Sequence, residues 1–140
     1  MVIDFTNRLL KNYRHYSKWA RRQGISCYRI YDLDITQFPF CIDIYGPNVY
    51  MAEYHASHSM DENEHSDWLN SCILAVKEVL QVTEDKIYLK FRQRQKGLQQ
   101  YEKFSRAQKI DWVEESGLKF KINLTDYLDA GLFLDHRQTR

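Results

Sequence analysis

The stretch RQRQKGLQQYEKF, residues 92–104, concentrates side chains of the kinds that recognise nucleic acids. Arginine and lysine can neutralise phosphates, glutamine can hydrogen-bond to base edges, and an aromatic ring can stack on an unpaired base. The glycine in the stretch lets the backbone approach a ligand closely. A solvated polar loop would have the same composition. Their residue types make Arg92, Arg94, Lys96 and Tyr101 candidates for nucleic-acid contacts.

A second group of basic residues lies on an amphipathic helix predicted over residues 4–23. Its apolar residues recur at steps of three and four and so share one face, which holds Phe5, Leu9, Tyr13, Tyr16 and Ala20. The opposite face holds Lys11, Arg14, His15, Lys18 and Arg22, and Arg8 adds a further cation. We expect Asp4 to cap the start of this helix and Gly24 to follow its end.

The two basic groups are hidden by a formal net charge of only +1. Residues 4–22 carry six Lys or Arg against one acidic residue, and residues 86–103 carry the same balance. Segregated positive charge is typical of proteins that bind phosphate backbones. A solvated helix face is the alternative, but such faces normally carry Glu four residues from the cations, and this helix has none.

Other clusters of polar residues are weaker candidates for chemistry. The histidines His55, His58 and His65 match no zinc-binding spacing, so we expect no metal site. The acidic and histidine side chains near the C-terminus are better explained as caps and turns than as catalytic groups; they are Asp126, Asp129, Asp135 and His136. The sequence has no phosphate-binding loop, nucleophile elbow or dinucleotide-binding glycine motif, so we expect no catalysis by these residues alone.

The chain between these groups predicts a mixed α+β domain. Strands rich in Ile, Val, Tyr and Phe are predicted over residues 27–35, 40–46 and 48–55, with a turn at Gly46-Pro47-Asn48. A second helix over about 62–81, capped by Asp61, and a strand over 86–94 follow. Two short strands are predicted over 111–115 and 118–124. The order α-βββ-α-βββ predicts a mixed or antiparallel sheet with helices packed on one side.

Length and composition point to a single domain over residues 1–140, with 44% hydrophobic residues to build its core. No stretch approaches the roughly 20 apolar residues that cross a bilayer, and the N-terminus lacks the apolar segment of a signal peptide, so we expect a cytoplasmic protein without a membrane partner. Cys27, Cys41 and Cys72 are odd in number and form no Cys-x-x-Cys pair, which predicts small buried side chains.

Three segments resemble a known family. FTNRLLKNYRHYSKWARRQGISCYRIYDLDI, RQRQKGLQQYEKF and GLKFKINLTDYLDAGLFLDHRQTR together are similar to the RlmKL family of S-adenosylmethionine-dependent 23S ribosomal RNA methyltransferases, at the start of its guanine-N7 methyltransferase half. The chain departs from the family pattern at Gln93, where the family usually has Glu, and at Ala130, where it usually has Thr.

The resemblance implies that the chain is the substrate-side subdomain of a larger enzyme, with residues 126–140 leading into a downstream Rossmann domain. It implies large-subunit ribosomal RNA as partner and S-adenosylmethionine as the parent enzyme's cofactor, which the chain alone would not bind tightly or use. By the same resemblance, Phe133, Asp135 and Arg137 would lie beside the cofactor. The residues themselves leave open a different class of protein, a stand-alone basic interaction or scaffolding module that binds a protein partner.

Overall fold

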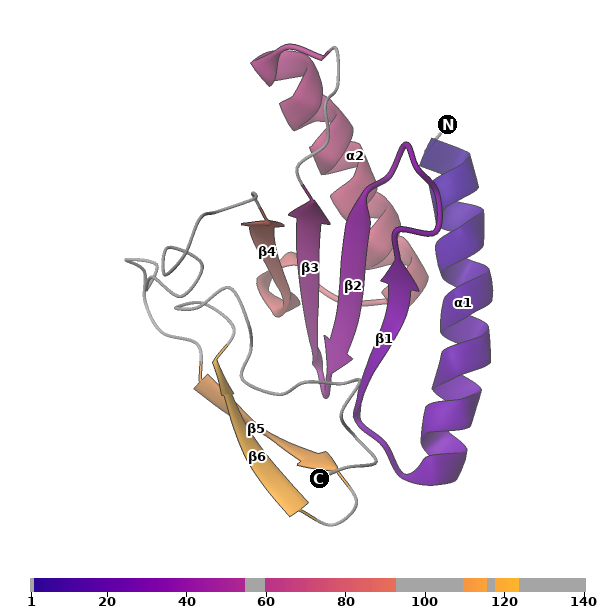
Figure 1. The fold of residues 1–140 in the computed structure, drawn as a ribbon, viewed down its shortest axis with the longest axis vertical. Helices are drawn as coiled ribbons and strands as arrows, with labels where there is room; N and C mark the ends of the chain where they lie inside the picture. The colour runs from indigo at the N-terminus through magenta and orange to yellow at the C-terminus, as the bar shows by residue number, and fades with distance from the viewer. Residues whose placement is uncertain (1, 55–59, 93–109, 116–117, 124–140) are drawn as a thin grey trace.

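A computed structural model describes residues 2–54, 60–92, 110–115 and 118–123 (Figure 1). The RNA-side candidates Arg94, Lys96 and Tyr101 lie outside these ranges, and so do Phe133, Asp135 and Arg137 near the C-terminus.

The first element is helix α1, Val2–Gln23. It already includes residue 2, so the prediction that Asp4 is its N-cap is wrong: Asp4 lies in the first turn, where a carboxylate is still favourable beside the positive end of the helix dipole. The predicted end of the helix is confirmed. Gly24 has a φ of 65°, its N–H donates to the carbonyl of Arg21, and the N–H of Ile25 donates to the carbonyl of Ala20. These two hydrogen bonds make a Schellman motif, which ends the helix at a position that favours glycine.

Three antiparallel strands follow, as predicted: β1, Cys27–Asp32, β2, Phe40–Tyr45, and β3, Asn48–Tyr54. Gly46, with a φ of 61°, makes the tight turn between β2 and β3. β1 ends three residues earlier than predicted, because Leu33 takes a positive φ of 57° and turns the chain away from the sheet.

Helix α2, Glu62–Leu80, begins at the predicted cap: a side-chain oxygen of Asp61 accepts a hydrogen bond from the N–H of Glu64 at 2.8 Å. After the short 3-10 helix η1, Glu84–Lys86, strand β4, Ile87–Arg92, pairs in parallel with β3. The main sheet is therefore mixed, with the order β1-β2-β3-β4. Strands β5, Ile110–Glu115, and β6, Leu118–Asn123, pair with each other as a separate antiparallel hairpin.

Both helices pack against one face of the main sheet, which confirms the predicted α+β architecture (Figure 1). Phe5 of α1 is fully buried there, and its ring lies 5.2 Å from the rings of both Tyr31 and Phe38. Trp68 of α2 stacks on Phe40 with ring centroids 5.3 Å apart. Aromatic rings from both helices and the sheet therefore fill the centre of the core.

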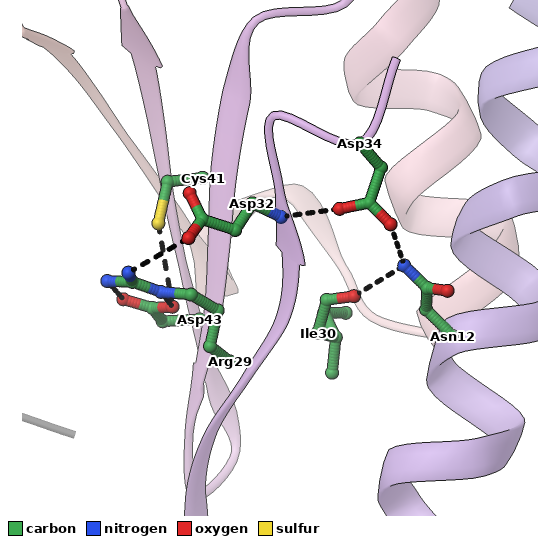
Figure 2. Close-up of polar contacts among 7 residues, drawn as sticks. All are labelled: Asn12, Arg29, Ile30, Asp32, Asp34, Cys41 and Asp43. Carbon is green, nitrogen blue, oxygen red and sulfur yellow. Dashed lines mark hydrogen bonds and ion pairs between the residues drawn. The ribbon is translucent and has the colours of Figure 1, made fainter. Parts of the chain in front are cut away.

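The opposite face of the sheet has a smaller core of its own, made by the alternate strand residues Cys27, Cys41, Tyr45, Tyr50 and Ala52. A salt bridge crosses this face between neighbouring strands (Figure 2). Nε of Arg29 lies 2.7 Å from Oδ1 of Asp43, and Nη2 lies 3.2 Å from Oδ2. The two-pronged hydrogen bond to Asp43 raises the pKa of Arg29 further above its ordinary value. The buried carboxylate thus lies beside a permanent cation.

Asn12 connects α1 to the end of β1 (Figure 2). Its side-chain amide donates to the carbonyl of Ile30 at 2.9 Å and to Oδ2 of Asp34 at 2.8 Å. The other oxygen of Asp34 accepts from the N–H of Asp32 at 3.0 Å. These contacts are directional, whereas apolar packing alone tolerates small rotations, so Asn12 fixes which face of α1 turns to solvent.

All three cysteines are buried, as predicted, and all three are free thiols. Desolvation, with a smaller contribution from the Glu53 carboxylate, raises the pKa of the Cys72 thiol to about 12. Since the thiolate is the reactive form, we expect Cys72 to react slowly at neutral pH.

Asn12→Ala should lower the free energy of unfolding by about 1–2 kcal/mol relative to Asn7→Ala, because it removes a part-buried hydrogen bond to the Ile30 carbonyl and an exposed one to Asp34. Asn7 is an exposed residue of the same helix, so both changes bring the same gain in helix propensity. Urea denaturation of the two variants gives the comparison, and equal stabilities would show that Asn12 does not anchor the helix.

The native protein should react with iodoacetamide at neutral pH far more slowly than the urea-unfolded protein does, because its cysteines are buried and the thiolate of Cys72 is disfavoured. Mass spectrometry of timed samples measures this. Rapid alkylation of Cys72 in the native state would contradict its position in the core.

Candidate nucleic-acid interface

The outer face of α1 carries a stripe of cations, defined here as Lys11, Arg14, Lys18 and Arg22. All four side chains are exposed, while Phe5 on the inner face is fully buried. The prediction that the basic residues of α1 lie on a face opposite the buried one is therefore confirmed. Lys11 and Lys18 are two turns apart, about 10 Å along the axis at roughly 1.5 Å per residue.

The inner face differs from the prediction at two residues. Helical periodicity places Tyr16 in the apolar stripe, but 39% of this residue is exposed. Trp19, which the same periodicity assigns to neither face, is half-buried and packs against the core instead. Trp19 lies between the buried face and the cations, so the helical pattern alone gives it no clear side.

The cations of the stripe have no acidic partners among the described residues. The ion pairs found there involve Arg29 and His65. Arg14, Lys18 and Arg22 follow one another at four-residue steps, and like charges at this spacing destabilise a helix. The stripe therefore lowers the stability of the helix instead of adding to it.

The stripe surrounds an open depression of about 570 Å³ on the helix surface. Its described lining is Asn7, Leu10, Lys11, Arg14, His15, Lys18, Trp19 and Arg22. All four stripe cations are therefore brought together around one concavity. Arg8 is also exposed but does not line it.

The second predicted basic group does not join the stripe within the part of the chain that the structure describes. Arg92 is the last residue of β4, at the opposite edge of the sheet from β1, the strand beside which α1 lies (Figure 1). Arg94, Lys96 and Tyr101 follow it outside the described ranges, so their RNA contacts stay a prediction.

His65 makes a contact between helix and sheet. Its Nε2 lies 2.7 Å from Oε2 of Glu53, which links α2 to β3. Trp68 and Phe91 flank its ring. The other histidine and acidic candidates lie outside the described residues; they are His55, His58, Asp126, Asp129 and His136. No group of three or more metal-binding side chains occurs in the described ranges, and none of the described helices is long and apolar enough to cross a membrane.

The sequence is similar to those of curated ribosomal RNA methyltransferases. It is 49% identical over 139 residues to ribosomal RNA large subunit methyltransferase K of Neisseria meningitidis, and 48% identical over 141 residues to methyltransferase K/L of Shewanella loihica. The alignments cover 99% and 100% of this chain but only 39% and 20% of those proteins. The chain thus spans well under half the length of these relatives. No protein-family model matches it.

The fold occurs in solved structures of larger proteins. One is described as a methyltransferase, SMU.776, complexed with SAH, with a TM-score of 0.69 and 21% identity over 99% of this chain and 34% of that one. Another is described as a SAM-dependent methyltransferase from Streptococcus mutans, with a TM-score of 0.66 and 20% identity, again over 34% of its length. At these identities the likeness concerns the fold.

Lys18→Glu should raise the free energy of unfolding by roughly 0.5–1 kcal/mol, because it replaces two repulsive four-residue pairs, with Arg14 and Arg22, by two attractive ones. Chemical denaturation at low ionic strength measures the gain, which should shrink in high salt as the charges are screened.

Lys77→Glu on α2 is the matched control, since it has no charged residue three or four positions away and lies at the negative end of its helix dipole. It should be neutral or destabilising. A decrease in stability in Lys18→Glu would show that the stripe is not self-repulsive.

Proposed function

We propose that this chain, which is homologous over nearly its whole length to part of the ribosomal RNA large subunit methyltransferases K and K/L, is the RNA-binding subdomain of such an enzyme. Its place would be at the start of the guanine-N7 methyltransferase half, immediately before the Rossmann domain. In this arrangement the chain holds large-subunit ribosomal RNA, and the downstream domain transfers the methyl group.

The observation that carries the proposal is the uncompensated stripe of α1. Its four exposed cations lie on one helix face without acidic partners among the described residues, and the buried apolar face and Asn12 hold the stripe toward solvent. A phosphate backbone supplies the negative charge that the protein itself does not supply there. Arg8 at the margin of the stripe would add a further phosphate contact.

A second contact with RNA would come from residues 92–101. Arg92, Arg94, Lys96 and Tyr101 have the residue types for phosphate binding and base stacking. Because β4 ends at the far edge of the sheet from α1, a single RNA that meets both groups would extend across the domain (Figure 1).

The cofactor of the proposed parent enzyme is S-adenosylmethionine. One of the solved structures with this fold is described as complexed with SAH, the product of methyl donation. Phe133, Asp135 and Arg137 are our candidates for its first contacts, since an arginine can pair with the methionine carboxylate and an aromatic ring can pack on the ligand. The other contacts would come from the Rossmann domain, so calorimetry should find weak binding of S-adenosylmethionine to the 140-residue chain.

RNA binding is tested by fluorescence anisotropy with a labelled fragment of 23S ribosomal RNA. The logarithm of the affinity should fall linearly with the logarithm of the salt concentration, and Lys11→Gln with Lys18→Gln should reduce the slope by about 0.7–0.9 for each phosphate that is no longer neutralised. Lys77→Gln on α2 is the control and should leave the slope unchanged. Arg94→Ala with Lys96→Ala tests the second basic segment in the same way.

Absence of binding at low salt would refute the RNA-binding role. The alternative, a module that binds an acidic protein, predicts instead that a partner captured from lysate is retained after nuclease treatment, whereas a partner bridged by RNA is released.

A further inference from the structure

The depression on α1 contains more than cations. Trp19 and His15 lie in its lining together with Lys11, Lys18 and Arg22. Aromatic side chains in a depression contribute nothing to the binding of duplex phosphates. The bases of a duplex are stacked within the double helix, so these side chains cannot reach them.

Trp19 is held in place by the core, and His15 contacts a neighbouring ring. Trp19 packs against the main hydrophobic core, so only part of its indole reaches the surface. The ring of His15 lies against Tyr16, with centroids 5.0 Å apart and planes at 76°. Rigid aromatic surfaces lose little conformational entropy when a ligand stacks on them, which favours binding.

The size and charge of the depression fit one nucleotide of a single strand. Its volume of about 570 Å³ lies within the range of roughly 300–1000 Å³ that is usual for small-ligand sites. The cations around it can neutralise the phosphates on either side of a base. Cationic grooves with aromatic side chains are the common way in which proteins bind single-stranded nucleic acid.

We infer that the α1 depression takes an unpaired RNA nucleotide, with its base against Trp19 and His15 and its flanking phosphates on Lys11, Lys18 and Arg22. This rests on the proposed RNA-binding function and adds a preference to it: the α1 face selects single-stranded over double-stranded RNA.

The test compares two labelled RNAs with the same total number of nucleotides and therefore of phosphates, an unstructured oligouridine and a fully paired duplex of half its length, each titrated with the 140-residue chain. The single strand should bind at least about ten times more tightly. Trp19→Leu should weaken its binding by roughly 5- to 150-fold, the range found when one stacking aromatic is removed. The same variant should leave duplex binding unchanged, and Trp19→Phe should restore most of the single-strand affinity.

Circular dichroism establishes that each variant is folded. Because Trp19 also contacts the core, His15→Ala is a second variant in which an exposed side chain is removed, and it should weaken single-strand binding selectively. Lys11→Gln should weaken the binding of both RNAs alike, since both present phosphates.

Two results would overturn the inference in different ways. Equal affinity for the two RNAs, unaffected by Trp19→Leu and His15→Ala but reduced by Lys11→Gln, would leave RNA binding intact and remove the nucleotide site. If the oligouridine, the duplex and the ribosomal fragment all fail to bind, the proposed function itself is refuted.

Discussion

The burial of one face of α1 against the sheet is the contact on which the rest of the structure depends. Phe5 and Leu9 are fully buried, and Phe5 meets aromatic rings from β1, from β2 and from the turn between them. Burying two such side chains contributes about 3–6 kcal/mol, which is a large part of the stability of a small domain. Because roughly 100° of rotation separates successive residues of a helix, fixing these two fixes every other side chain of α1.

Polar contacts fix the relative positions of helix and strands, which apolar burial alone sets only approximately. On the helix-covered side, Asn12 joins α1 to the backbone of β1 through directional hydrogen bonds. On the other side, Arg29 and Asp43 join β1 to β2 (Figure 2). The Asp43 side chain is only 4% exposed, so its charge is tolerable only because a guanidinium and hydrogen bonds replace water. The sheet thus carries an apolar layer on one face and a mixed tyrosine and ion-pair layer on the other.

Features that depend on neighbouring residues could be predicted from the sequence, and features that depend on tertiary packing could not. Helix periodicity, the Asp61 cap and the glycine turns at Gly24 and Gly46 depend on neighbouring residues, and the structure confirms them. The cationic face of α1 was predictable for the same reason. The sequence left open whether the sheet is mixed or antiparallel, and it did not identify β3 as the partner of β4, because this pairing joins strands that are distant along the chain. The roles of Trp19 and Tyr16 were missed for different reasons: Trp19 lies near the border between the faces, whereas Tyr16 falls within the apolar stripe and tertiary packing leaves it 39% exposed.

The pairing of β3 with β4 also bears on how the chain folds. Strands β1, β2 and β3 follow one another through short connections, so their ladders close small loops at little entropic cost. β4 reaches β3 only after the chain has passed through residues 55–86, including the whole of α2. During synthesis from the N-terminus, α1 and the three-stranded meander can pair as soon as they leave the ribosome, whereas β4 must wait. Strand β4, which leads into the basic residues 92–101, is thus the last strand of the main sheet to gain its partner.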